Sequence, residues 1–131
     1  MGFLIHTIDG RLNAATEYLP CGAITPKVGL ALTMTNGNLA VASGTTKPAY
    51  ICLRNDEAAV ASGTVIPVTR VLPDTIFETT ASASMASVNV GAKVTLAADG
   101  LQVTGTTTDG VAEIVSMDGT AAGSTVRVRF A

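Results

Sequence analysis

The sequence has no tryptophan, one histidine, two cysteines and few aromatic or charged residues. Only 4% of its 131 residues are aromatic and 14% are charged, whereas an average soluble domain has roughly 25% charged residues. Two cysteines are too few for the disulfide framework of a small secreted domain, and their spacing is not that of a zinc site. The composition therefore points away from disulfide scaffolds and zinc proteins.

Charge of either sign forms no long run. Eight Lys and Arg are scattered among ten Asp and Glu, for a formal net charge of -2, and no basic stripe is present to neutralise a row of phosphates. No stretch approaches the ~20 apolar residues of a membrane span, and residues 1–5 lack the basic start of a signal peptide. We therefore expect a protein made in the cytoplasm that binds neither nucleic acid nor membrane.

Catalytic, cofactor and metal motifs are also missing from the sequence. There is no HxH, HExxH or CxxC pattern, and the glycines at 100, 105 and 110 are too widely spaced to cradle a phosphate. The one catalytic arrangement left open is a small hydrolase that uses His6 with Cys21, Cys52 or an acid, but no third group is indicated to orient the histidine. The sequence therefore predicts a protein that is not an enzyme, with no cofactor and no metal.

What the chain does contain is tight-turn dipeptides between short apolar runs. Asn36-Gly37 separates two such runs early in the chain, and Asp99-Gly100, Asp109-Gly110 and Asp118-Gly119 punctuate the last third. These dipeptides supply the residues of positive φ that a hairpin turn needs, so they predict a strand meander. The segments expected as later strands are residues 49–53, 64–72, 75–80, 93–97, 101–106, 111–117 and 125–130.

The last of these strands alternates most strictly. Val126, Val128 and Phe130 fall on one face, which we expect to meet the core, and Arg127 and Arg129 fall on the face toward solvent or an acidic partner. Seven to nine short strands with a turn about every ten residues are typical of a β-sandwich or small barrel. The predicted fold class is all-β, a small sandwich or tulip-like barrel with little helix and an extended N-terminal arm.

Residues 1–26 differ from the β-rich remainder, 27–131. They begin with an apolar run, turn at Asp9-Gly10 and then contain several helix and strand breakers. We expect them to form an arm that pairs with something outside its own core, because unpaired apolar side chains need a partner surface. The alternative is that the arm folds back to complete its own sheet. The candidate contact residues are Phe3, Leu4, Ile5, Ile8 and Leu12.

Several stretches together resemble one known family. They are residues 28–32 (VGLAL) before the Asn36-Gly37 turn, 39–51 (LAVASGTTKPAYI), 90–96 (VGAKVTL) with 99–104 (DGLQVT), 110–115 (GVAEIV) and 126–130 (VRVRF). With them the chain resembles the head decoration, or capsid cement, proteins of tailed bacteriophages.

This resemblance implies a small β-rich module, without catalytic residues, that binds the outside of an assembled phage head. It implies the major capsid protein as partner, a homotrimer as the oligomer and the exterior of the virion as the location. The low charge and the mean hydropathy of +0.44 agree with a protein that covers much of its surface in an assembly. The alternative is a β-sandwich recognition module, such as part of a fibre or a carbohydrate-binding domain.

Overall fold

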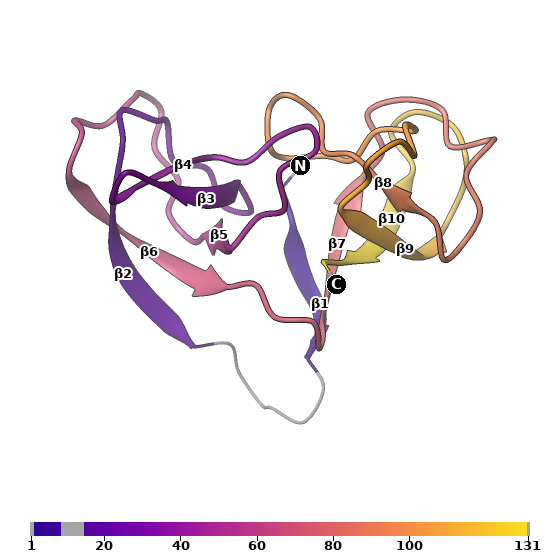
Figure 1. Cartoon of the computed structure of the whole chain (residues 1–131), viewed down its shortest axis with the longest axis horizontal. Helices are drawn as coiled ribbons and strands as arrows, with labels where there is room; N and C mark the ends of the chain where they lie inside the picture. Colours follow the sequence, from indigo (N-terminus) through magenta and orange to yellow (C-terminus); the bar gives the residue numbers. More distant parts are fainter. Residues whose placement is uncertain (1, 9–14, 131) are drawn as a thin grey trace.

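The computed structural model describes residues 2–8 and 15–130, and every regular element in this part of the chain is a β-strand. The strands form two lobes, a five-stranded sheet and a closed barrel (Figure 1). The sheet has the order β1 (Leu4–Ile8), β7 (Thr75–Thr80), β10 (Thr125–Arg129), β9 (Ala112–Met117), β8 (Lys93–Val94). The barrel has the order β2 (Thr16–Cys21), β4 (Asn38–Val41), β3 (Ala31–Thr35), β5 (Tyr50–Cys52), β6 (Thr64–Arg70). The all-β prediction is confirmed.

The Asn36-Gly37 hairpin is present and joins β3 to β4. Asn36 has a φ of 50° and Gly37 a φ of 82°, and two consecutive positive φ values are the geometry of a type I′ turn, whose twist matches that of the strands it joins. Of the Asp-Gly pairs, Asp109 also has a positive φ, and Gly100 closes a turn by donating its N–H to the carbonyl of Ala97 at 3.0 Å. Asn36-Gly37, Asp99-Gly100 and Asp109-Gly110 therefore mark turns as predicted, whereas Asp118-Gly119 follows β9 in a bend.

Two expected strands are shorter than predicted. Residues 93–97 contain only the two-residue β8, and residues 101–106 contain only isolated bridges, at Val103. The two segments still pair: the N–H of Ala97 donates to the carbonyl of Gln102 at 2.9 Å, and the N–H of Thr104 to the carbonyl of Thr95 at 3.0 Å. They form an irregular hairpin, of which only residues 93–94, as β8, belong to the five-stranded sheet.

Pro67 lies inside β6, although a proline, which has no N–H to donate, is ordinarily found at a sheet edge or a bulge. It pairs with Tyr18 of β2 on one side, and its carbonyl accepts the N–H of Leu53 at 3.0 Å on the other. Because the N–H and the carbonyl of a strand residue point to the same side, the N–H that Pro67 lacks would have donated to Leu53, one position beyond the end of β5 at Cys52. The proline therefore costs one hydrogen bond, at the point where the pairing of β5 with β6 ends.

Each lobe has its own cluster of buried side chains. Phe130 lies at the centre of the sheet cluster, 5.4 Å from the ring centre of Phe3 and 5.7 Å from that of Phe77. The barrel interior holds the second cluster, with Leu32 and Ile66 fully buried. The outer wall of the barrel also contributes to the sheet cluster, through Ala31, Ala42 and Ile51. The two lobes are therefore packed together.

The described part of the N-terminal segment belongs to these two lobes. β1 pairs antiparallel with β7, and β2 pairs antiparallel with β6 and meets β4 at Cys21. We expected residues 1–26 to form an arm that pairs outside its own core. For the described residues of this segment that expectation is wrong: they complete the sheets of their own chain, which was the alternative. An apolar run of strand-forming residues gains the same backbone pairing from an internal neighbour as from a partner, without an association cost.

A bulge in β1 decides which of its side chains face the core. Ile5 pairs with Phe77 and Ile8 with Thr75, but three positions on β1 span only two on β7. The extra residue lets both Ile5 and Ile8 lie on the same face as the buried Phe3, whereas His6 and Leu4 lie on the outer face with Glu78. Without the bulge, strict alternation would turn Ile8 to the outer face.

Candidate functional site

The five candidate contact residues lie in different surroundings. Phe3 is 1% exposed and donates its N–H to the carbonyl of Gly29 at 2.8 Å, so it is a core residue and not a contact for a partner. Leu4 and Ile5 are each 39% exposed on the outermost strand of the sheet, and Ile8 is half-buried. Leu12 lies outside the described residues. Of the four candidates that the structure describes, only Leu4 and Ile5 therefore display a large part of an apolar side chain.

The outer face of the sheet carries a row of charged side chains. Arg127 of β10 donates from Nε to Glu78 at 3.1 Å and from Nη1 to Asp118 at 2.8 Å, and Nδ1 of His6 lies 3.6 Å from the same Glu78. Further along β10, Arg129 pairs with Glu113 at 3.0 Å. The sequence predicted that both arginines face outward, and the structure places them there. Each of them already has a carboxylate partner within the chain, so neither is left for an acidic ligand.

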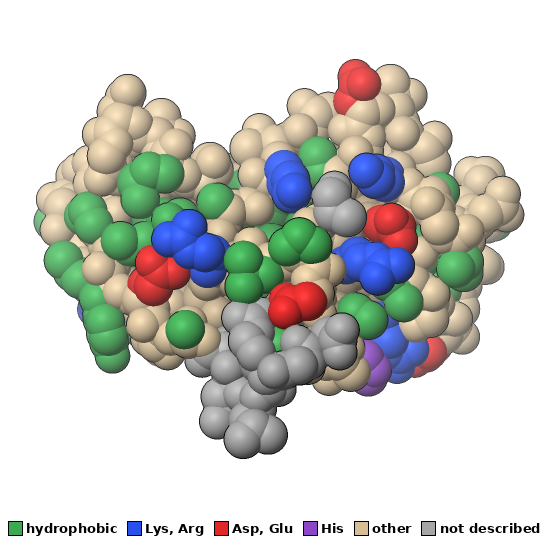
Figure 2. All heavy atoms as spheres, turned by 60° about the horizontal axis from the view of Figure 1, so that its bottom comes forward, with side chains coloured by type: hydrophobic (Ala, Val, Ile, Leu, Met, Phe, Trp, Pro, Cys, Tyr) green, Lys and Arg blue, Asp and Glu red, His purple; other side chains and the backbone are tan. Residues whose placement is uncertain are grey.

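These pairs shift the protonation of their members. The hydrogen bond from Arg127 lowers the pKa of the Asp118 carboxyl, and the same hydrogen bond raises the pKa of the Arg127 guanidinium. Both groups therefore stay charged across the neutral range. Figure 2 shows the consequence on one side of the molecule, where Lys and Arg stand beside Asp and Glu and no large area has one sign of charge.

The cysteines and the histidine are not brought together. Cys21 and Cys52 are both free thiols, fully buried in the barrel cluster, whereas His6 lies on the outer face of the sheet. Desolvation by burial raises the pKa of both thiols, so they stay protonated at neutral pH. Both cysteines therefore pack as small apolar residues, and the Cys–His arrangement is not formed.

The barrel wall away from the sheet displays an uncharged apolar patch that the sequence did not reveal. Tyr18 of β2 is 70% exposed and lies opposite Pro67, and Pro20 lies opposite Val65, which is 54% exposed. These four residues, Tyr18, Pro20, Val65 and Pro67, are called the barrel-wall patch below. Directly opposed residues of an antiparallel pair share one face, so the patch is continuous across β2 and β6.

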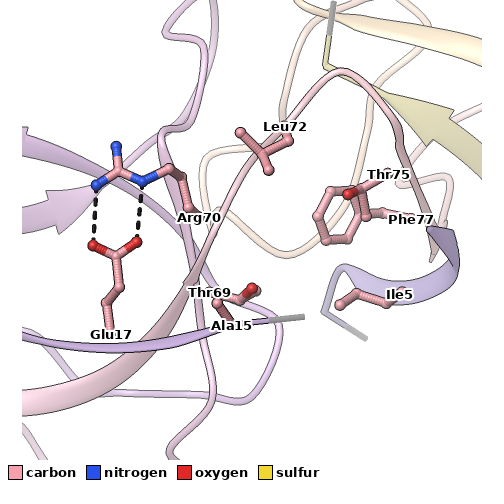
Figure 3. A pocket seen from close by; sticks show the side chains of 8 residues that line it. All are labelled: Ile5, Ala15, Glu17, Thr69, Arg70, Leu72, Thr75 and Phe77. Carbon is pink, nitrogen blue, oxygen red and sulfur yellow. Dashed lines mark hydrogen bonds and ion pairs between the residues drawn. The ribbon is translucent and has the colours of Figure 1, made fainter. Parts of the chain in front are cut away.

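A pocket of about 140 Å³ lies where the barrel meets the sheet (Figure 3). Ile5, Leu72 and Phe77 line its sheet side, and Ala15 and Thr69 line its barrel side. Ala15 is exposed and Ile5 is 39% exposed, whereas Thr69 and Phe77 are buried. The pocket is therefore open to the surface and has an apolar floor.

An ion pair forms the rim of this pocket on the barrel side. Arg70 donates from Nε and Nη2 to the two carboxylate oxygens of Glu17, at 3.0 Å each, and its guanidinium lies 5.1 Å from the ring centre of Tyr50. The hydrogen bond to Glu17 raises the pKa of Arg70, which keeps the guanidinium charged. The two charges neutralise each other, so the pocket offers no free charge to a ligand.

The barrel-wall patch had one signal in the sequence. Residues 16–21 read Thr-Glu-Tyr-Leu-Pro-Cys, in which Leu19 and Cys21 face the barrel interior and Tyr18 faces out. Pro20 was interpreted as a breaker, which concealed this alternation. The pocket between the barrel and the sheet, called the junction pocket below, had no signal in the sequence, because its walls come from four strands of both lobes.

Among residues 2–8 and 15–130, no group of three or more His, Cys, Asp or Glu is arranged to hold a metal ion. The same part of the chain has no helix long and apolar enough to cross a membrane. A scan against models of known protein families and a search of curated proteins found no match to this chain.

Proposed function

We propose that this chain is a capsid decoration, or cement, protein that binds the outer surface of an assembled phage head and stabilises the contacts between capsomers. It is made in the cytoplasm of the host bacterium, acts as a homotrimer and has the major capsid protein as its partner. It binds no nucleic acid and no membrane, and it transforms no substrate. The proposal starts from the family resemblance of the sequence.

One structural observation carries the proposal furthest, namely the barrel-wall patch. Tyr18 at 70% and Val65 at 54% are more exposed than apolar side chains of their size ordinarily are, and prolines flank them on a rigid barrel. A rigid uncharged patch loses little conformational entropy on binding, and tyrosine is enriched at the centres of protein interfaces. Weak contacts of this kind add up when they are repeated over a shell.

A protein that binds only the assembled shell stabilises that shell over its separated parts. The proposal is tested with expanded heads purified from a mutant of the encoding phage that lacks this chain. The added protein should co-sediment with the heads and raise the temperature at which they release their DNA. Replacing Tyr18 and Val65 together by serine should weaken head binding, while Leu53→Ser and Val28→Ser, also at exposed positions, should not. Heads that neither bind the protein nor gain heat resistance would refute the proposal.

The exposure of Tyr18 also favours the alternative, a recognition module of a fibre or a carbohydrate-binding domain. An exposed aromatic ring on a flat strand surface is a platform on which a sugar ring can stack. Titration of oligosaccharides followed by the fluorescence of tyrosine separates the two proposals. Saturable glycan binding that Tyr18→Ala abolishes, together with no binding to heads, would favour the recognition module.

A further inference from the structure

The junction pocket fits one uncharged apolar side chain. A cavity of about 150 Å³ lined by aliphatic and aromatic groups binds benzene. This pocket has a volume of about 140 Å³, and its lining includes the apolar side chains of Ile5, Leu72 and Phe77 beside the neutral side chains of Thr69 and Thr75. The rim pair of Glu17 and Arg70 is closed by two hydrogen bonds of 3.0 Å. A charged group entering the pocket would lose hydration and gain no partner, so the occupant must be neutral.

The chain itself carries an exposed, uncharged apolar side chain that suits this pocket. Val90 is 63% exposed, more than any other large aliphatic side chain among residues 2–8 and 15–130. It lies at the tip of a tight turn, because the carbonyl of Asn89 accepts the N–H of Ala92 at 3.0 Å and Gly91 has a φ of 94°. These features are those of a type II turn with Val90 at its first central position.

This turn is held rigidly to the sheet and carries no charge. The N–H of Gly91 donates to the carbonyl of Ile114 at 2.8 Å, and the N–H of Ile114 donates back to Ala92 at 2.9 Å. Val90 therefore projects on a pre-organised support, and its insertion into a pocket costs little conformational entropy. The other exposed valine in a tight turn, Val28, follows a lysine and lies in a turn packed against Gly2.

The two features lie at opposite edges of the five-stranded sheet. The pocket is lined by β1 and β7 at one edge, and Val90 stands three residues before β8, which forms the other edge. A chain therefore cannot place Val90 in its own pocket, but it can do so in a second copy. Such a contact joins unlike surfaces, so an open array has a free pocket at one end and a free valine at the other, unless it closes into a ring.

We propose that the chain associates with itself head to tail, with Val90 of one copy seated in the junction pocket of the next. The contact stands apart from capsid binding and is tested on the purified chain alone. Burying a valine of this exposure contributes about 10- to 100-fold to an association constant. Because both surfaces are uncharged or neutralised, the association does not weaken as salt is raised.

Two variants each remove one half of the contact. Ala15→Leu fills the pocket from an exposed position, and Val90→Ser removes the projecting side chain. The matched controls make the same chemical changes elsewhere: Ala59→Leu at an exposed site and Val28→Ser in another exposed turn. Sedimentation equilibrium should show concentration-dependent association of the wild-type chain and both controls, and an association constant about 10- to 100-fold lower for each of the two variants.

Mixing the two variants gives the sharpest readout. Ala15→Leu keeps Val90 and Val90→Ser keeps the pocket, so the mixture should form one-to-one dimers and nothing larger. Circular dichroism shows whether each variant is folded, and a misfolded Ala15→Leu protein is replaced by Ala15→Met. A wild-type chain that stays monomeric at its solubility limit, variants that associate like the wild type, or a mixture that fails to pair would overturn the proposal. If the chain associates in this way but does not bind phage heads, the proposed capsid function is refuted, whereas the proposed contact between copies is supported.

Discussion

The burial of Phe3 predicts that the start of the chain is essential for stability. Phe3 is 1% exposed, and its ring packs edge-on against Phe130 at 5.4 Å. Replacing a buried phenylalanine by alanine costs about 3–5 kcal/mol, because the lost burial is added to the cost of the cavity. Small domains have a free energy of unfolding of about 5–15 kcal/mol. Phe3→Ala should therefore remove a large part of the stability of this protein.

The assay is urea unfolding followed by far-ultraviolet circular dichroism, since the chain has no tryptophan to report by fluorescence. Leu4→Ala is the matched control, because Leu4 is the next residue along the chain and is 39% exposed. Its loss should stay below about 1 kcal/mol, and both variants should keep the wild-type dependence on urea. If Phe3→Ala does not fold, Phe3→Leu leaves a smaller cavity and gives a smaller loss in the same direction.

The two interpretations of residues 1–26 differ sharply in this experiment. A free arm contributes nothing to the folded core, so Phe3→Ala would change the free energy of unfolding by no more than about 0.5 kcal/mol, as surface substitutions do. A loss for Phe3→Ala no larger than that for Leu4→Ala would refute the argument that β1 completes the sheet of its own chain.

Three further outcomes are expected. Gly37→Ala should lower the free energy of unfolding by about 1–2 kcal/mol because of its positive φ alone. Gly29→Ala should lower it by about 1–3 kcal/mol more, because its new Cβ would lie 2.5 Å from the Cα of Gly2. Equal losses of stability for the two variants in thermal unfolding would contradict this contact. Arg127 lowers the pKa of Asp118, so the stabilisation that Asp118 provides is present above the ordinary pKa of 3.8 and is lost as pH falls through the lowered value. The difference in free energy of unfolding between wild type and Asp118→Asn should therefore shrink in acid. A difference that does not change with pH would contradict the ion pair. Both cysteine thiols should ignore dithionitrobenzoate in the native protein and react fully in urea, because burial raises the pKa of each and blocks access; rapid reaction of the native protein would show that the barrel opens.

Local pattern was enough to predict the last two strands, β9 and β10. In residues 125–130 the alternation of apolar and charged side chains is complete, and β10 follows it, with Val126 and Val128 fully buried. Residues 111–117 likewise contain β9. A period of two in the sequence is a direct consequence of strand geometry, so it needs no knowledge of the neighbouring strand.

Strand partners could not be predicted in the same way. β1 pairs with β7 some seventy positions later in the chain, and nothing local in the apolar run of residues 3–8 says whether its partner is internal or external. The bulge at His6 is also invisible in the sequence, although it decides that Ile8 follows Ile5 on the core side. The junction pocket depends on both pairings, so it could not be predicted before the lobes were placed.

The topology also restricts how this protein can bind a partner. A closed barrel has no free edge, β8 is only two residues long, and the bulge in β1 interrupts the regular spacing of hydrogen-bonding groups along the remaining edge. Addition of a partner's strand to the edges of the described sheets is therefore disfavoured. Contacts made by side chains, such as Tyr18 and Val65 on the barrel wall, remain available. Because these contacts add no backbone hydrogen bonds, their strength should depend on a few side chains, and single substitutions should reveal them.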